Sequence, residues 1–365
     1  MMALALVPDV RHGGRRRIDL VGVLLAAAAL VCLTFGLTEG QRYGWNAGIL
    51  ALLGAAAVLL VLFLLHQRAR QDREPLLPFA LFRARDFAAM SFVSATVQVG
   101  MLGLFLPVMI YLQSVLRFGA LAAGLVMAPA MVVSAVLSPF AGRLADRIGG
   151  KPVLLAGLAL FAAGLAWLAG VVGLGRAWWE FQPALVTAGV GIGCVFGPMV
   201  TVAMYHVPPA TAGAASGVLN TIRQIGTVIG SAAVGALLQN RLAAAVRDEA
   251  AREAAGLPAE VRDRFLTGVR EAAAGGRELG TGRGGGPTVD LPPDTPAELA
   301  RQVDRLAAAA FDHGVVHAVR PTLLLPVVVV ALGALACLLV RGRRPDRASP
   351  APAPADADSP APARK

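Results

Sequence analysis

Residues 120–172 read ALAAGLVMAPAMVVSAVLSPFAGRLADRIGGKPVLLAGLALFAAGLAWLAGVV. Two apolar runs flank the short basic segment Gly142–Lys151, and each is about as long as the roughly 20 residues that cross a bilayer as a helix. Short connections rich in arginine and lysine stay on the cytoplasmic side of a membrane. The pattern therefore predicts two transmembrane helices joined by a tight cytoplasmic loop.

The predicted loop combines one acid with three cations and three glycines. These residues are Asp146, Arg143, Arg147, Lys151, Gly142, Gly149 and Gly150. Glycine lets the backbone turn sharply and lets two helix ends approach closely. One interpretation is a cytoplasmic gate, in which the acid forms salt bridges between helices that move. The other is a positive-inside turn whose aspartate caps a helix.

The composition indicates a membrane protein. Of 365 residues, 56% are hydrophobic and only 15% are charged, and the mean hydropathy is +0.64. Soluble domains carry about a quarter charged residues. The net charge of +10 does not indicate a nucleic-acid partner, because the arginines gather at the ends of apolar runs and in one long hydrophilic segment. Cys32, Cys194 and Cys337 each lie in an apolar run, so neither a disulfide framework nor a zinc site is expected.

About eight apolar runs are long enough to cross a bilayer. They are Ile18–Leu37, Ala47–Leu65, Phe87–Leu112, Ala120–Ala141, Pro152–Val172, Pro183–Tyr205, Ser216–Leu238 and Pro321–Val340. If the runs alternate in direction, the short arginine-rich connections all fall on one side, and both termini lie there too; a long loop crosses the membrane largely regardless of its charge. We expect an all-α integral membrane protein that is multi-pass, lies in the plasma (inner) membrane and has both termini in the cytoplasm.

The polar segments between the runs divide the chain into parts. These are a cytoplasmic N-terminal segment (1–17), a two-span unit (18–66), a cytoplasmic or interfacial linker (67–86), a six-helix bundle (87–238 and 321–340), an extracellular helical loop (239–320) and a disordered cytoplasmic tail (341–365). We expect helices of the long loop to lie against the membrane or over a pore mouth. Its His313 and His317 have a spacing that could share a metal, but no carboxylate or cysteine completes a ligand set, so no metal site is expected.

Glycine recurs at four-residue spacing in two of the runs. The positions are Gly189, Gly193 and Gly197, followed by Pro198, in the sixth run, and the pairs Gly213 with Gly217 and Gly226 with Gly230 in the seventh run and its approach. Small residues at this spacing let another helix pack closely, and a proline inside a helix removes a backbone hydrogen bond. Static helix packing is one interpretation. Packing that slides during a conformational change is the other, and the proline favours it.

Polar side chains interrupt the apolar runs at a few positions. Those that could line a substrate cavity are Gln98, Thr187, Asn220, Arg223 and Gln224. An unpaired cation inside a bilayer costs at least a few kcal/mol. Arg223 must therefore face a polar interior or a partner, or reach the interface by snorkelling. The other residues could equally form ordinary hydrogen bonds between helices.

Several motifs together resemble one family. The segment Gly142–Lys151 resembles the G-x-L-a-D-r-x-G-r-k signature of the major facilitator superfamily (MFS), with Gly150 in place of one usual cation. The run Gly189–Gly193 with Pro198, and the run Ala215–Gly226, resemble second-half signatures of its fourteen-span drug:proton antiporter (multidrug efflux) branch. The proline-rich linker and the long loop before the last run also suit that branch, and the resemblance covers residues 15–345.

The resemblance implies a function and a gap. It implies two extra spans plus one six-helix MFS bundle, with alternating access around a midplane site, amphipathic small molecules as substrate and protons as the coupled ion. The first bundle of such transporters, with its membrane-embedded acids, has no counterpart here. We therefore expect the chain to be the C-terminal half of such a transporter. A truncated product, a start codon placed too late, or a separate N-terminal half that acts as its partner would explain this.

Two other classes of function remain for comparison. A non-transporting membrane fragment is the alternative to a transporter. An intramembrane enzyme has little support, because the chain has no H-E-x-x-H motif and no Ser/His/Asp set at one depth in the membrane. We therefore expect no catalytic residues and no cofactor.

Overall fold

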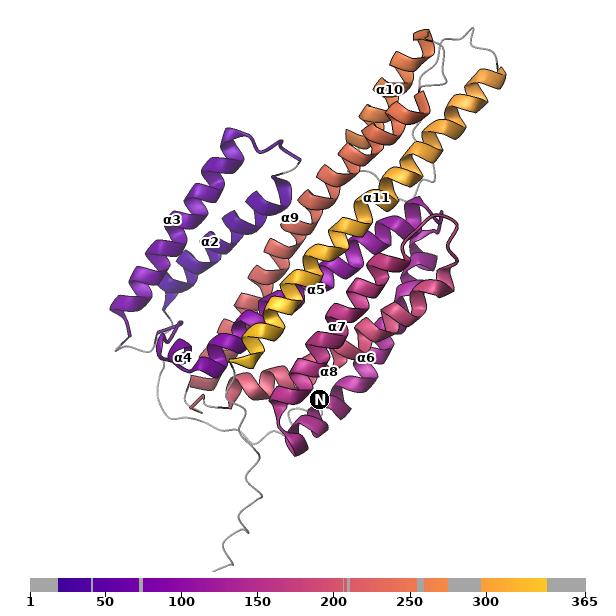
Figure 1. The fold of residues 1–365 in the computed structure, drawn as a ribbon. Coiled ribbons are helices and arrows are strands. Elements are labelled where there is room, and N and C mark those ends of the chain that lie inside the picture. Colours follow the sequence, from indigo (N-terminus) through magenta and orange to yellow (C-terminus); the bar gives the residue numbers. More distant parts are fainter. Residues whose placement is uncertain are drawn as a thin grey trace, which may run out of the picture. The chain divides into compact units, whose positions relative to one another are not determined.

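The computed structural model describes residues 19–40, 42–71, 75–205, 207–208, 211–254, 259–274 and 297–339. The predictions for 1–17, for 341–365 and for the middle of the long loop lie outside these ranges. Within them every regular element is a helix, and none is a strand (Figure 1).

Eight helices of the described chain are long and apolar enough to span a membrane. They are α2 (Leu20–Glu39), α3 (Ala47–Ala69), α5 (Arg85–Ser114), α6 (Ala120–Ile148), α7 (Gly150–Val171), α8 (Gln182–Met204), α9 (Ala212–Glu253) and α11 (Ala297–Leu338). Shorter elements are α4 (Ala80–Arg83), the 3-10 helix η1 (Trp178–Phe181) and α10 (Ala259–Ala274). Each long helix matches one of the eight apolar runs. The prediction of an all-α integral membrane protein is confirmed.

The chain forms two compact units, each described here by itself. The first unit comprises residues up to 83 together with 207–221, and the second comprises 84–206 and the residues from 222 onward. The first residues of α9 thus belong to the first unit, and the rest of α9 belongs to the second.

In the first unit, α2 and α3 form an antiparallel pair with a narrow buried seam. The buried positions of α2, which are Gly22, Ala29 and Gly36, recur every seven residues, the repeat that brings two helices together in a left-handed coil. Most large apolar side chains of the pair are exposed, such as Leu24 at 69%. Such surfaces suit contact with lipid, which is as apolar as leucine.

In the second unit, α8 packs between α6 and α7, while α11 packs against α5 and α7. Large side chains in the middle of these helices are fully buried, including Met90, Leu104, Leu154, Phe161 and Leu165. Because lipid supplies no hydrophobic driving force between helices, this bundle depends on close van der Waals packing.

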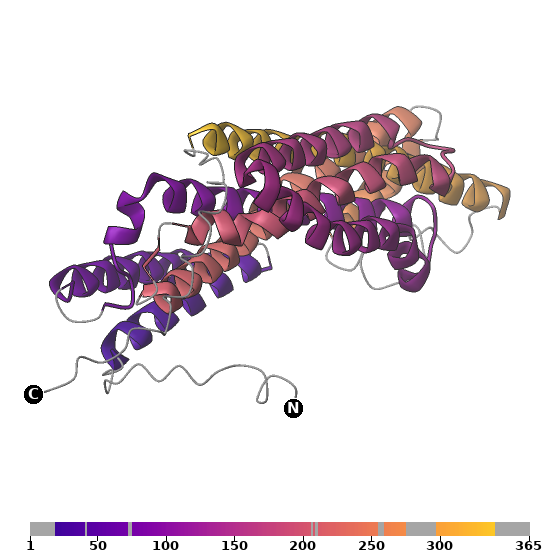
Figure 2. The same cartoon turned by 90° about the horizontal axis from the view of Figure 1, so that it is seen from below.

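The helices on both sides of the predicted extracellular loop (239–320) extend far into it. α9 continues unbroken from its apolar part to Glu253, and α11 begins at Ala297 and passes through Pro321 without a break. The two helices run side by side (Figure 1, Figure 2), and Gly314 of α11 packs against Val246 of α9. The reason is local sequence: residues 236–254 are alanine-rich and contain neither glycine nor proline, so the helix has no signal to end.

Candidate functional site

The connection between α6 and α7 (the α6–α7 junction, residues 142–151) is a helical corner rather than the predicted ten-residue loop. α6 extends to Ile148 and α7 begins at Gly150, so only Gly149 lies outside a helix. Gly149 has φ +95°, a backbone conformation that residues with a Cβ rarely adopt. The two helices and the tight connection agree with the prediction, but its extent was wrong, because one glycine makes the whole turn and the basic residues lie on helical turns.

The α6–α7 junction also brings the ends of two other helices together. A Cβ on Gly150 would clash with the side chain of Val202 near the end of α8. The Lys151 Nζ donates a hydrogen bond of 2.7 Å to the carbonyl oxygen of Leu338, the last residue of α11. A cation at this position satisfies a carbonyl that the helix itself cannot pair.

The charged residues on the α6 side of the junction point outward. Arg143, Asp146 and Arg147 are exposed, and the Arg143 guanidinium carbon lies 5.9 Å from the centre of the Phe140 ring. Among the residues that the structure describes, Asp146 forms no ion pair. The salt-bridged gate therefore stays a prediction.

The glycines of α8 lie directly against the backbone of α6. The pairs are Gly189 with Ala130, Gly193 with Ser134 and Gly197 with Ser138. A Cβ added to Gly193 would lie 2.8 Å from the Ser134 carbonyl oxygen, closer than real Cβ atoms come. Both helices advance by four residues per contact, so the two backbones stay close along two turns.

The other face of α8 is equally close to α7. A Cβ on Gly164 would lie 2.6 Å from the Ala188 nitrogen, and one on Gly157 would lie 2.8 Å from the Cys194 Cβ. Pro198 lies buried near the end of the same helix. α8 is thus enclosed by two neighbouring backbones, with one backbone hydrogen bond missing at the proline.

A second close contact joins α9 to α5. A Cβ on Gly226 would lie 2.7 Å from the Ala95 Cα, and one on Gly230 would lie 2.9 Å from the Val99 Cα. Gly217 lies in the first unit, where a Cβ would meet no described atom within 4 Å. Its packing role stays a prediction.

The structure brings two of the five polar candidates near one another. Gln98 Nε2 donates to Thr227 Oγ1 at 2.9 Å, and that hydroxyl donates to the carbonyl oxygen of Arg223 at 3.1 Å. Gln98 therefore faces the stretch of α9 that carries Arg223. Gln98 thus forms an ordinary hydrogen bond between helices, which is one of the two interpretations given above. The role of Arg223 as a cavity residue stays a prediction.

The other three polar candidates are not brought into this group. Thr187 Oγ1 donates to the Pro183 carbonyl oxygen of its own helix at 2.7 Å. Gln224 is exposed, and Asn220 is exposed and belongs to the first unit. The described residues of the second unit thus show no cluster of all five.

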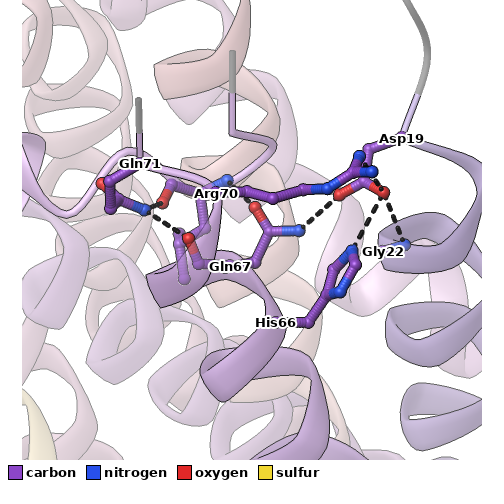
Figure 3. Close-up of polar contacts among 7 residues, drawn as sticks. Asp19, Gly22, His66, Gln67, Arg70 and Gln71 are labelled. Carbon is purple, nitrogen blue, oxygen red and sulfur yellow. Dashed lines mark hydrogen bonds and ion pairs between the residues drawn. The ribbon is translucent and has the colours of Figure 1, made fainter. Parts of the chain in front are cut away.

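Asp19, the second residue of the predicted run Ile18–Leu37, is a buried acid. Its side chain is 4% exposed and caps α2 by accepting a hydrogen bond of 3.1 Å from the Gly22 N–H. Three side chains from the end of α3 converge on the same carboxylate (Figure 3): His66 Nε2 at 3.1 Å, Gln67 Nε2 at 2.9 Å and the Arg70 guanidinium at 3.0 Å.

The Asp19 cluster (Asp19, His66, Gln67 and Arg70) continues into the linker after α3. Gln67 Oε1 accepts from the Leu77 N–H at 3.2 Å, so one glutamine contacts both the acid and the linker. Gln71 Nε2 donates to the Leu77 carbonyl at 3.1 Å, and its Oε1 accepts from the Phe79 N–H at 3.0 Å. The linker is therefore held by two glutamine side chains.

We expect a pH dependence at the Asp19 cluster. Burial alone would raise the pKa of Asp19, but hydrogen bonds from His66, Gly22 and Gln67 and the charge of Arg70 outweigh it, so the pKa lies below its ordinary value. A depressed pKa stabilises the folded state above the ordinary pKa of about 4, and this stabilisation is lost as the pH falls through the folded pKa.

The measurement is hydrogen exchange of the Leu77 amide in the unmodified chain and in Asp19→Asn. Above about pH 5 the Leu77 amide should exchange more slowly in the unmodified chain than in Asp19→Asn. This difference in exchange rate should vanish below the folded pKa of Asp19. Comparing the two proteins at each pH cancels the intrinsic pH dependence of exchange. A difference that persisted unchanged to the most acid condition would contradict the assignment.

Comparison with known proteins identifies the family of this chain. The family model "Major Facilitator Superfamily" matches residues 20–231, more than half of the chain. The chain is 32% identical to the "Probable actinorhodin transporter" of Streptomyces coelicolor, over 73% of this chain and 49% of that protein. It is 32% identical to "Multidrug resistance protein Stp" of Mycobacterium tuberculosis, over 67% of this chain and 45% of that protein.

A further relative is the "Tetracenomycin C resistance and export protein" of Streptomyces glaucescens, which is 29% identical over 74% of this chain and 48% of that protein. The chain spans about half the length of the curated relatives it matches. The family match points to a transporter rather than an enzyme. This multi-pass, all-helical membrane protein belongs to the Major Facilitator Superfamily.

Proposed function

We propose that the chain forms the C-terminal part of an exporter of amphipathic, drug-like small molecules, of the fourteen-span drug:proton antiporter branch and located in the plasma (inner) membrane. In this proposal α2 and α3 are the two extra spans, and α5 to α9 with α11 form one six-helix bundle. The observation that carries the proposal is the close glycine packing of α8 against α6 and of α9 against α5, in a chain similar to proteins named for drug resistance and export.

The glycine contacts support a moving bundle for a physical reason. Backbones in direct contact are not locked by interdigitated side chains, so one helix can shift along another with little repacking. In alternating access, one bundle rocks against another around a midplane site. We infer that Gln98, Thr187, Asn220, Arg223 and Gln224 contribute polar positions to the substrate path, with apolar surroundings that suit amphipathic molecules.

The gate is proposed at the α6–α7 junction on the cytoplasmic side. Gly149 makes the corner, and Asp146 is the acid that would pair with a cation when that side closes. Gly142, Arg143, Arg147 and Lys151 complete the junction. The contact of Lys151 with the end of α11 supports the view that the ends of three helices move together here.

Replacing Asp146 with asparagine tests the gate. The chain is fused to the N-terminal half of the Streptomyces coelicolor relative, and dye efflux is measured in cells. We expect Asp146→Asn to reduce efflux about tenfold, because a charge-assisted hydrogen bond contributes roughly 1.5 kcal/mol. Asp263→Asn on α10, also exposed, is the matched control and should leave efflux unchanged. Equal efflux from the Asp146 variant and the unmodified fusion would count against the gate.

Proton coupling is proposed from the family resemblance. Among the described residues the buried acids are Asp19 and Asp86, and both lie at helix ends. We propose that the membrane-embedded acids for coupling come from a separate N-terminal half. Dissipating the proton gradient with a protonophore should then stop efflux by the fusion within the time of one assay. Efflux that continued at the same rate would exclude proton antiport.

The second candidate is a membrane fragment that does not transport, or a half-transporter that needs a partner half. The chain alone and the fusion are expressed at equal levels in cells that accumulate dye. If the chain needs a partner half, only the fusion lowers dye accumulation. Efflux by the chain alone would remove this candidate, and efflux by neither would favour a fragment that does not transport.

A further inference from the structure

A pocket in the first unit has the lining of a phospholipid site. It has a volume of about 840 Å³ and lies between the end of α3, the linker and α4. The α3 wall consists of Val61, Leu64, Leu65 and Arg68, a spacing that places all four on one face of the helix. The other lining residues are Gln71 after α3, Phe79 in the linker, and Ala80 and Arg83 of α4.

The charges of the pocket all have one sign. Arg68 and Arg83 are exposed, and neither forms an ion pair with any residue that the structure describes. None of the lining residues is acidic. Arginine binds phosphate through two parallel hydrogen bonds, and two arginines lining one pocket suit one phosphodiester group.

The apolar side chains of the pocket favour the phosphate of a lipid over a free phosphate ion. Val61, Leu64 and Leu65 precede Arg68 along α3 and are 55%, 39% and 57% exposed. They lie on the apolar part of a helix that qualifies as a membrane span, and Arg68 follows at its end. Charge and apolar surface thus meet in the order in which a phospholipid presents its phosphate and its acyl chains at a membrane surface.

The pocket is prebuilt by the hydrogen bonds of the linker. Gln71 contacts the backbone of Leu77 and Phe79, and Gln67 contacts Leu77 and Asp19. These contacts hold the linker, and with it α4 and Arg83, across from the end of α3. A preorganised site loses little conformational freedom when its ligand binds.

We propose that this pocket binds an anionic glycerophospholipid, with the phosphate between Arg68 and Arg83 and an acyl chain along Val61, Leu64 and Leu65. The site is separate from the α6–α7 junction and requires no transport activity. Its test is therefore independent of the proposed function.

The experiment measures lipid retained by the full purified chain in detergent, by native mass spectrometry. Phosphatidylglycerol and phosphatidylcholine with identical acyl chains are offered in equal amounts. We expect a preference of about tenfold for phosphatidylglycerol, because both lipids carry the phosphate but only phosphatidylcholine adds a choline cation, which the two arginines repel. Equal retention of the two lipids by the unmodified chain would overturn the proposal without any variant.

Two variants locate the site. Arg68→Gln combined with Arg83→Gln should abolish the preference for phosphatidylglycerol. Arg42→Gln is the matched control, because Arg42 is an exposed arginine at the far end of the same helix pair, paired with Glu39 at 3.4 Å. It should leave the preference intact. Retained selectivity in the double variant, or equal loss in the control, would place the lipid elsewhere and contradict the proposal.

A competition arm separates lipid from free anion. Inorganic phosphate at 100 times the lipid concentration should displace little phosphatidylglycerol, because it makes no contact with the apolar wall. Displacement by phosphate at the same concentration as the lipid would show a simple anion site and overturn the assignment of a lipid.

Discussion

Replacing Gly189 with leucine is expected to unfold the second unit at a much lower temperature than the unmodified chain. A Cβ at this position would meet the backbone of Ala130, with its Cα at 2.9 Å and its carbonyl carbon at 3.0 Å. Backbone atoms cannot move aside as a flexible side chain does, so α8 and α6 must separate. Overpacking of a well-packed contact costs about 3 kcal/mol, and separation also loses the dispersion contacts on which a membrane bundle depends.

The matched control is Gly124→Leu on α6. Gly124 is exposed, and a Cβ there would meet no described atom within 4 Å. Both variants add the same side chain, so the difference between them reports the close approach alone. Thermal unfolding in detergent, followed by the fraction of protein that stays monodisperse, is the measurement. Melting of Gly189→Leu within about 2 °C of the control would contradict the packing account.

Replacing Asp19 with alanine is expected to release the linker and the end of α3 in the first unit. The substitution removes the cap of α2 and leaves Arg70 and Gln67 without their acceptor. Breaking a buried ion pair costs about 3–5 kcal/mol. Arg70 is 40% exposed and can turn toward water, so we expect about 2–3 kcal/mol.

Two further variants separate the parts of this effect. Asp19→Asn keeps a good capping residue but removes the charge. Asn46→Ala removes only a cap, that of α3, where Asn46 accepts from the Ile49 N–H at 3.0 Å, and should cost about 1 kcal/mol.

Hydrogen exchange at the Leu77 and Phe79 amides reports local opening of the linker. Exchange should accelerate most in Asp19→Ala, less in Asp19→Asn and least in Asn46→Ala. Slow exchange of both amides in Asp19→Ala would show that the linker is held without the acid.

The membrane helices could be predicted from the sequence because hydropathy reports a local property. About 20 consecutive apolar residues suffice to place a helix such as α3 or α7, whatever surrounds it. The glycine repeat of α8 was also readable, since its four-residue spacing follows from helix geometry alone. The repeat could not identify its partner. Ala130, Ser134 and Ser138 on α6 are small residues at the same four-residue spacing, but so are Ala162, Ala166 and Gly170 on α7.

The misplaced elements have physical reasons as well. All residues of the α6–α7 junction were predicted to lie in a loop because the segment is rich in charged residues. Charged residues can form a helix, however, and one residue, Gly149, makes the turn. α9 and α11 were predicted too short, because hydropathy marks where the apolar part ends and not where the helix ends. The Asp19 cluster joins residues 47 to 51 positions apart, and only pairing of the two helices brings them together.

Cysteine labelling of intact cells tests the central claim most directly: the second unit crosses the membrane, with the α6–α7 junction in the cytoplasm and α10 outside. Cys32, Cys194 and Cys337 are first replaced by serine, and Arg147→Cys and Thr267→Cys, both at exposed positions, are then introduced one at a time. A membrane-impermeant maleimide should label Thr267→Cys in intact cells and Arg147→Cys only after the cells are permeabilised. Labelling of Arg147→Cys but not Thr267→Cys in intact cells would contradict the account.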